Sequence, residues 1–335
     1  MLPRRRIGRH GPVVSALGLG TMGMSEGYYG PSDDASSVAT IRHAVDLGVS
    51  LIDTADVYGT AGHNEMLVGR ALEGLRDRVT LATKTGLVQT PEGLAVDARP
   101  ERIRRAIEES LRRLRADRID LYYLHRVDPR VPVEESVGAM AGLVAEGLVG
   151  HIGLSEVGPA TLRRAHAVHP IAAVQSEYSL WNRDPEALLL PVMRELGVAL
   201  VAFSPLGRGF LAGALAGGGA LDEDDMRRRL PRFQGDNLAR NRPIAERVAE
   251  VATRHGATAA QVALAWLLGR GDDVVPIPGT RRRENLASNV AAAALRLDPE
   301  DLARLDDPGL APSGDRYPPE LMDLLDPEVR APRGS

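Results

Sequence analysis

Cysteine is absent from the sequence, and its absence excludes several kinds of chemistry. A chain without thiols forms no disulfides, carries no cysteine nucleophile and offers no thiolate to a metal. The 8 histidines are scattered and show no metal-ligand spacing, so we expect no metal site. The lack of disulfides also fits a reducing compartment, and we expect a cytoplasmic protein.

Excess charge and long apolar runs are also missing. The 335 residues include 41 basic and 45 acidic side chains, for a formal net charge of -4, which indicates neither a nucleic-acid partner nor an acidic membrane surface. No apolar run is long enough to span a bilayer, and the arginines at 4–6 are not followed by the apolar stretch of a secretory signal. We therefore expect a globular protein without a membrane partner, whose oligomeric state the composition leaves open.

Apolar strand-like runs alternate with amphipathic helical stretches along the whole chain. Such alternation predicts parallel strands joined by crossover helices, as in an open doubly wound sheet or a closed (β/α)8 barrel. The number of runs favours the barrel; they lie near residues 16–20, 51–53, 79–84, 119–125, 150–155, 172–175, 199–204 and 274–277. A hairpin turning at 10–12 precedes them. No linker divides the chain, so we expect one domain over 1–335, with a peripheral tail from about 312 to 335.

Residues 206–242, after the seventh predicted strand, interrupt the alternation of strands and helices. The stretch is long, charged and rich in glycine, including the run at 217–219, and Pro243 is expected in the first turn of the helix that follows. A loop of this size in a compact domain is usually functional or disordered. We expect it to be mobile alone and to become ordered around a bound cofactor.

A glycine motif near the N-terminus suggests an alternative fold, the dinucleotide-binding Rossmann unit. Gly18, Gly20 and Gly23 form the pattern G-x-G-x-x-G after a strand. In a dinucleotide-binding Rossmann unit this motif must open a helix, with an acid about 20 residues on. Here the sequence MSEGYYGPSDD follows, which is typical of a loop. We therefore interpret the glycines as the first loop at the mouth of the barrel.

Polar residues stand at the C-terminal ends of the predicted strands, where barrel enzymes place their active sites. Each has an ordinary structural interpretation, such as a helix N-cap for Asp56. Their repetition at one end of consecutive strands instead predicts a shared site. In chain order they are Asp53 with Tyr58, Lys84, His125, Ser155, Gln175, Phe203 and Ser204.

Four of these residues, Asp53, Tyr58, Lys84 and His125, are suited to proton donation, and we call them the tetrad. A free tyrosine has a pKa near 10, and a nearby ammonium is expected to lower it. Asp53 would keep Lys84 charged and aimed. Tyr58 would then donate a proton to a substrate oxygen that becomes negative, as in carbonyl reduction, while a neutral His125 orients that oxygen.

The same residues resemble the aldo-keto reductase family over nearly the whole chain. The motifs that carry the resemblance are VSLIDTADVYG, LATK, LYYLH, GHIGLSE, VQSEYSL, AFSPLGRGFL and PIPGTRRRENLASN. The resemblance implies a (β/α)8 barrel with this tetrad, a nicotinamide cofactor, usually NADPH (NADP+), and no metal. It also implies that a small aldehyde or ketone accepts a hydride while Tyr58 supplies the proton.

The resemblance further implies which residues hold the ligands. Ser155 and Gln175 match positions on the carboxamide, and Phe203 matches an aromatic stacked on the nicotinamide. The other implied cofactor positions are Gly20, Thr21, Met22, Asp53, Glu156, Ser204, Pro205, Leu206, Gly207, Arg208, Gly209, Pro278, Gly279, Thr280, Arg281, Asn285 and Asn289. Two of them depart from the family pattern, since Glu156 replaces a common asparagine and Asn285 a common arginine or glutamine. The candidate substrate pocket comprises Met22, Tyr28, Tyr58, His125, Arg126 and Trp181.

Three functions remain open at this stage. The first is an NADPH-dependent carbonyl reductase, with Arg281 and Thr280 holding a ribose 2′-phosphate. The second is a non-catalytic regulatory subunit of the same fold that retains cofactor, against which the complete tetrad argues. The third is an isomerase or aldolase in which Lys84 forms a Schiff base, although Asp53 would keep that lysine protonated and a poor nucleophile.

Overall fold

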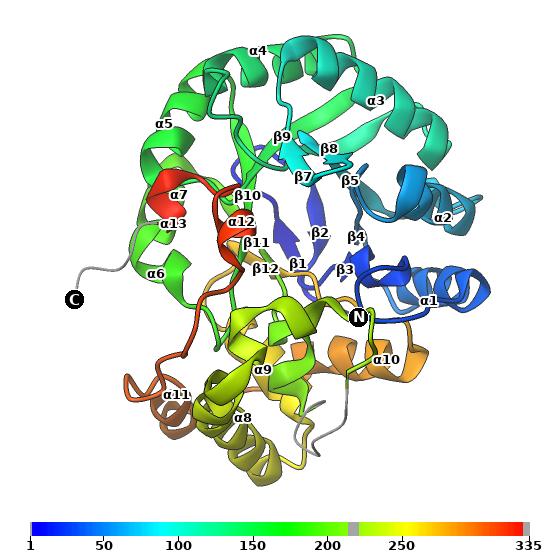
Figure 1. Ribbon diagram of the computed structural model, residues 1–335. Coiled ribbons are helices and arrows are strands. Elements are labelled where there is room, and N and C mark those ends of the chain that lie inside the picture. The colour runs from blue at the N-terminus through cyan, green and yellow to red at the C-terminus, as the bar shows by residue number, and fades with distance from the viewer. Residues whose placement is uncertain (1, 214–220, 331–335) are drawn as a thin grey trace.

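Eight parallel strands form the centre of the molecule in a computed structural model that describes residues 2–213 and 221–330 (Figure 1). Their order in the sheet is β12-β11-β10-β9-β8-β5-β4-β3. The backbone nitrogen of Gly18 donates to the carbonyl of Pro276 at 2.9 Å, which brings the two edges of the sheet together. The expected (β/α)8 fold is confirmed. The strands are β3 (Leu19–Gly20), β4 (Leu51–Asp53), β5 (Thr80–Thr85), β8 (Ile119–Leu124), β9 (Val149–Ser155), β10 (Ile171–Glu177), β11 (Ala199–Phe203) and β12 (Val274–Pro276).

Helices surround the strands and bury one face against them (Figure 1). In α3, Ile103, Ile107 and Leu114 are buried at helical spacing, while most of the charged residues between them, such as Arg104 and Glu108, are exposed. Pro100 occupies the first turn, where its missing N–H is not needed. The helices of this layer are α1 (Asp34–Asp46), α2 (His63–Ala71), α3 (Pro100–Leu114), α4 (Val133–Ala145), α5 (Pro159–Val168), α6 (Asp184–Leu188), α7 (Leu190–Leu196), α9 (Ala259–Leu268) and α10 (Arg283–Ala291).

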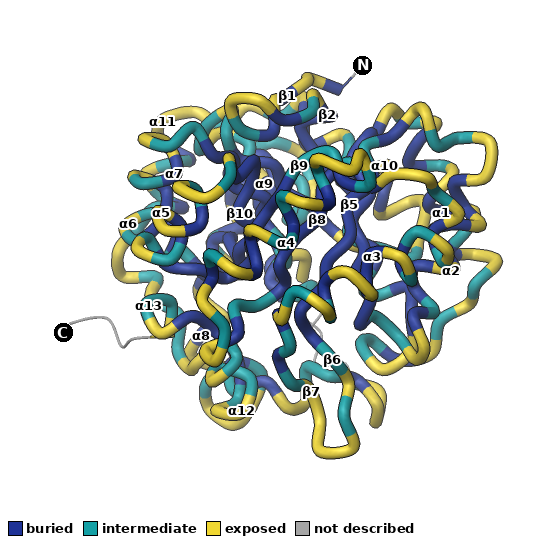
Figure 2. The backbone as a smooth tube through the Cα atoms, turned by 90° about the horizontal axis from the view of Figure 1, so that it is seen from above, coloured by how far each residue is buried: buried dark blue, intermediate teal, exposed yellow. Residues whose placement is uncertain are grey.

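The two ends of the barrel carry different hairpins. The expected N-terminal hairpin, β1 (Arg4–Arg6) with β2 (Val13–Ser15), closes one end, and Ile7 and Val14 join the core inside the barrel. A second hairpin, β6 (Leu87–Thr90) with β7 (Gly93–Val96), follows β5 and lies at the opposite end (Figure 2). The open end of the barrel is therefore the end to which the C-termini of its strands point.

The segment after β11 contains more regular structure than its composition predicts. Three 3-10 helices, η4 (Gly207–Ala212), η5 (Met226–Arg229) and η6 (Pro231–Phe233), precede α8 (Gly235–Arg254). Pro243 lies inside α8, so the prediction that it begins a helix is wrong. The carbonyl that a proline leaves unpaired is that of Ala239, an exposed residue where water can bind it. The glycines at 217–219 lie outside the described residues.

The C-terminal part of the chain returns to the open end of the barrel. After α11 (Pro299–Leu305), the chain forms α12 (Pro319–Met322) and α13 (Pro327–Arg330), and Figure 1 shows α12 in front of the strands. Among the described residues, no helix is both long and apolar enough to cross a membrane.

Candidate active site

A cavity of about 880 Å³ opens at the C-terminal ends of the strands. It brings together most of the residues that the sequence predicts for the site. Those that line it are Gly20, Met22, Tyr28, Asp53, Tyr58, His125, Arg126, Ser155, Gln175, Phe203, Ser204, Pro205, Leu206, Arg208, Gly209, Pro278, Gly279, Thr280, Arg281, Asn285 and Asn289. We call the part around Asp53, Tyr58 and His125 the tetrad side, and the part around residues 280–289 the α10 side.

The tetrad is assembled around Lys84, which has no exposed surface. Its Nζ lies 2.5 Å from Asp53 Oδ1 and 3.3 Å from Tyr58 Oη, and it donates to the carbonyl of Thr54 at 2.7 Å. Gln175 Nε2 donates to the other carboxylate oxygen of Asp53 at 2.7 Å. Lys84 is therefore fixed by three oxygens and lies behind the cavity wall.

Tyr58 reaches the site on a loop that is bonded to the neighbouring strand. The backbone nitrogens of Thr54 and Asp56 donate to the carbonyls of Ala82 and Lys84 in β5, at 3.0 and 3.2 Å. From the β6 side, Gln89 Nε2 donates to the carbonyls on both sides of Tyr58, those of Val57 and Gly59, at 3.1 and 3.2 Å. These bonds fix the position of the phenol.

His125 completes the group from the end of β8. Its ring packs edge-to-face against Tyr58 with centroids 5.8 Å apart, and its backbone nitrogen donates to the carbonyl of Thr85 at 2.7 Å. Its Nδ1 is buried and has no hydrogen-bond partner among the described residues. Burial lowers the pKa of His125 well below its usual value, with the charges of Arg126 and Lys84 adding to the shift. The ring is therefore neutral at neutral pH, as expected.

The electrostatics of Tyr58 differ from the sequence-based expectation. Burial and the charge of Asp53 raise the pKa of Tyr58 well above 10, and Arg126 opposes this shift. The predicted lowering by Lys84 is therefore wrong, because desolvation of the phenolate dominates. Burial likewise raises the pKa of Asp53 and lowers that of Lys84, while their contact opposes both shifts. Tyr58 thus holds its proton at neutral pH.

The α10 side of the cavity is built from the loop before α10 and from the first turns of α10 itself. Arg281 Nη2 donates to the carbonyl of Tyr29 at 2.8 Å, and its Nη1 contacts the carbonyl of Pro31. Arg281 thus links the segment before α10 to the loop after β3. Arg282 also lines the cavity, whereas Arg283 is exposed outside it.

Several predicted residues do not line the cavity. Glu156 points away: its carboxylate binds Arg316 at 2.7 Å and accepts from the backbone nitrogen of Glu177 at 2.8 Å. The side chain of Thr21 contacts the carbonyl of Asp53 at 2.8 Å, behind the wall. Gly207 is also absent from the lining.

Asp56, which the sequence offered as a helix N-cap, caps no helix. Its side chain is buried and lies 3.4 Å from Arg102.

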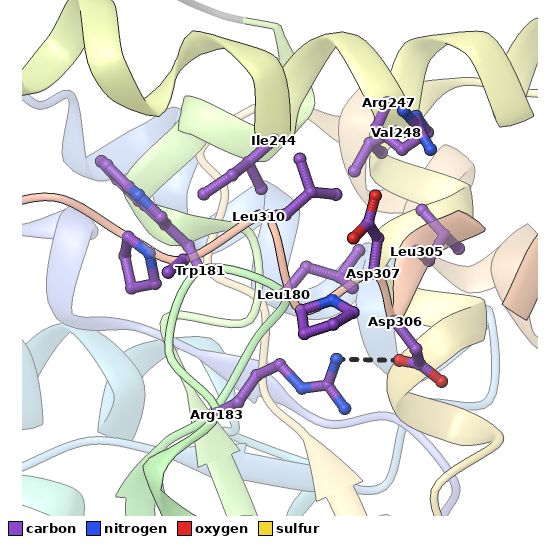
Figure 3. A pocket seen from close by; sticks show the side chains of 13 residues that line it. Leu180, Trp181, Arg183, Ile244, Arg247, Val248, Leu305, Asp306, Asp307 and Leu310 are labelled. Atoms are coloured by element: carbon purple, nitrogen blue, oxygen red, sulfur yellow. Dashed lines mark ion pairs between the residues drawn. The ribbon is translucent and has the colours of Figure 1, made fainter. Parts of the chain in front are cut away.

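Trp181, predicted for the substrate pocket, lies instead at a second, smaller cavity. That cavity measures about 280 Å³, and Figure 3 shows Trp181 beside Ile244 and Leu310 there. The indole stacks on Phe210 with ring centroids 3.9 Å apart and is almost completely buried. The placement of Trp181 is that of a core residue.

Other residues that the sequence did not predict also line the cavity, and two groups of them are apolar or aromatic. Tyr317, Leu321 and Leu324 come from the C-terminal segment. The sequence had suggested that this segment is a peripheral tail, and its place in the cavity wall does not fit that expectation. The spacing of these residues at i, i+4 and i+7 is the pattern of a helical apolar face and was the available signal. Leu87 and Leu94 come from the β6–β7 hairpin, for which the sequence offered only short runs.

Comparison with known proteins finds similar sequences over nearly the whole chain. The model of the aldo/keto reductase family matches residues 16–308. A relative from Glycine max, described as probable aldo-keto reductase 1, is 46% identical over 306 residues, which cover 90% of this chain and 87% of the relative.

Solved structures are also similar. A glycerol dehydrogenase from Gluconobacter oxydans has a TM-score of 0.82 and 32% identity, covering 91% of this chain and 94% of that chain. An aldo/keto reductase from Klebsiella pneumoniae, solved in complex with NADP and acetate, has a TM-score of 0.72 and 30% identity, covering 95% and 99%.

Proposed function

The chain belongs to the aldo/keto reductase family, and from this premise we propose that it reduces an aldehyde or ketone to an alcohol with NADPH, with Tyr58 as the general acid. The observation that carries the proposal is the position of Lys84, fully buried and in contact with both Asp53 and Tyr58. Asp53 and the carbonyl of Thr54 already pair the buried ammonium, so folding does not require its contact with the phenol of Tyr58. That contact therefore indicates a role for Tyr58 in the reaction.

The cavity suits a dinucleotide. Its volume of about 880 Å³ lies toward the upper end of the roughly 300–1,000 Å³ of small-molecule sites. Ser155 and Gln175 offer polar groups for a carboxamide on the tetrad side, and Phe203 offers an aromatic face beside them. On the α10 side, Thr280 and Arg281 offer groups for a phosphate. The bound nicotinamide would supply the hydride.

The proton that the reduction requires is donated by a side chain of this protein. Tyr58 gives its proton to the carbonyl oxygen as that oxygen becomes negative, and solvent restores the proton afterwards. Neutral His125 hydrogen-bonds the same oxygen and orients it. Lys84, whose Nζ lies 3.3 Å from the phenol oxygen, stabilises the phenolate left on Tyr58 after the proton is transferred.

The position of Lys84 also disfavours Schiff-base chemistry. Its ammonium is bonded to Asp53 and to the carbonyl of Thr54, and it does not line the cavity. An amine nucleophile must be neutral and accessible to the substrate. Reduction therefore accounts for this lysine better than aldolase or isomerase chemistry does.

The test is to mix the protein with NADPH and a panel of aldehydes and ketones and to follow nicotinamide absorbance. We expect oxidation of NADPH that depends on the carbonyl compound, with one alcohol formed per NADPH. Tight cofactor binding without turnover of any carbonyl compound would support a regulatory subunit instead. Isomer or aldol products formed without NADPH would support the third function.

A further inference from the structure

Arg126 is a cation on the tetrad side of the cavity whose hydrogen-bonding capacity is only partly used. It follows His125 at the end of β8 and is half-buried. Its Nη1 donates to the carbonyl of His125 at 2.5 Å and to Ser155 Oγ at 3.2 Å. Its Nε is buried without a partner, and within residues 2–213 and 221–330 no carboxylate forms an ion pair with the guanidinium.

Of the other arginines that line the cavity, Arg282 is exposed, and three have partners of their own. Arg227 pairs with Asp225 at 2.6 Å, and Arg208 lies 3.7 Å from Glu177. Arg281 donates to backbone carbonyls, as described above. In the described lining the one acidic side chain is that of Asp53, and both of its oxygens are already bonded. The carboxylate of Glu156, which is close enough to interact with the charge of Arg126, is bonded to Arg316, so among the described residues no ion pair is formed by Arg126.

A half-buried guanidinium without an ion-pair partner is energetically unfavourable unless an anion binds to it. Its planar fork of N–H donors matches a carboxylate in two parallel hydrogen bonds. We propose that Arg126 binds a carboxylate of the substrate, so that the preferred substrates are carbonyl compounds that carry a carboxylate group. This inference rests on the function proposed above and adds the chemical class of its substrate.

The location of Arg126 favours the substrate over the cofactor as the source of the anion. Arg126 adjoins His125, whose ring contacts Tyr58 and whose role is at the reacting oxygen. The groups suited to the cofactor's phosphates, Thr280 and Arg281, line the α10 side instead. A carboxylate held by Arg126 would therefore belong to the molecule whose carbonyl faces Tyr58.

Two aldehydes of nearly equal shape test this assignment. 4-Formylbenzoate carries a carboxylate, and methyl 4-formylbenzoate replaces it with a neutral ester. With NADPH, the wild-type protein should show a higher kcat/KM for the acid, by about 10- to 100-fold, because a charge-assisted contact contributes to one substrate alone. The difference should appear mainly in KM. Equal values for the two aldehydes would overturn the inference while leaving the proposed function intact.

Variants identify the residue responsible. Arg126→Gln should lower kcat/KM for the acid by about 10- to 100-fold and leave the ester nearly unchanged, and Arg126→Lys, which keeps the charge but loses the planar fork, should keep only part of the preference. Arg283→Gln, exposed and outside the cavity, controls for the loss of one charge. An equal fall for acid and ester, or weaker NADPH binding in Arg126→Gln, would overturn the assignment. No turnover of either aldehyde would refute the proposed function and this inference with it.

Discussion

Lys84, behind the cavity wall, and Arg281, in the cavity lining, are two cations of the site that are held in different ways. Lys84 is fully buried at the end of a strand, and its ammonium is bonded to Asp53, Tyr58 and the carbonyl of Thr54. Arg281 is partly exposed in a loop, and its guanidinium bridges to backbone carbonyls of another loop. The sheet thus fixes the tetrad side, whereas a loop and the start of α10 form the α10 side. We infer that substitutions on the tetrad side affect the reaction and folding together, and that those on the α10 side affect ligand affinity.

Lys84→Met is expected to have the largest effect. It leaves Asp53 buried without its cation, which should cost about 3–5 kcal/mol of unfolding free energy. Tyr58 also loses its ammonium contact, so kcat for carbonyl reduction should fall by about 100-fold or more. Denaturant unfolding and steady-state kinetics measure the two effects separately.

The double variant Asp53→Asn/Lys84→Met is the control for this experiment. Because it removes both buried charges, it should recover much of the lost stability. It should not recover kcat. Recovery of both quantities would mean that the contact between Lys84 and Tyr58 has no part in the reaction.

The carboxyl of Asp56 is expected to make folding stability depend on pH. Burial, together with the charge of Glu65, raises its pKa to about 7. Because the folded protein holds this proton where the unfolded chain has released it, unfolding free energy should fall as pH rises from about 4 to about 7. Asp56→Asn should remove up to about 4 kcal/mol of that fall, at about 1.4 kcal/mol per pKa unit.

Denaturation curves at a series of pH values test this prediction. The control is Asp46→Asn, whose exposed carboxylate lies 3.5 Å from Arg78. It should leave the pH dependence close to that of the wild type. If Asp56→Asn and the wild type lose the same stability over this range, Asp56 is not the responsible group.

Arg281→Gln examines the α10 side. If Arg281 holds the 2′-phosphate, the variant should weaken NADPH by about 10- to 150-fold and NADH much less. Fluorescence titration of both cofactors gives the dissociation constants, with Arg283→Gln as the matched exposed control. An equal loss for both cofactors would show instead that Arg281 acts by holding the loop after β3.

The smallest expected effect concerns the segment from 206 to 242. Met226 and Arg227, in η5, line the cavity, so bound NADPH should hold this segment in place. Limited trypsin digestion should cleave it several-fold more slowly when NADPH is added. Equal cleavage rates with and without cofactor would identify the segment as a passive insertion.

The difference between the strand-borne tetrad side and the rest of the site also explains which site residues could be predicted from the sequence. Asp53, Lys84 and His125 stand at the C-terminal ends of apolar strands, and a parallel sheet brings these ends together, so their meeting was predictable. The direction of the Tyr58 pKa was not, because it depends on how far the phenol is buried. Glu156 and Trp181 were misplaced because the sequence does not reveal their partners, Arg316 and Phe210. Arg316 is distant from Glu156 along the chain, and Phe210 comes from η4, in the segment after β11 whose structure the sequence did not predict.

The measurement that tests the central claim most directly is kcat and NADPH affinity of Tyr58→Phe. The variant removes the phenolic proton and keeps the ring, so kcat should fall by about 10²–10⁴-fold while the dissociation constant for NADPH stays within about twofold. Tyr122→Phe, a tyrosine buried between the sheet and the helices, serves as the control and should keep its activity. A Tyr58→Phe protein with nearly wild-type kcat would contradict the account, because the proton would then come from another group.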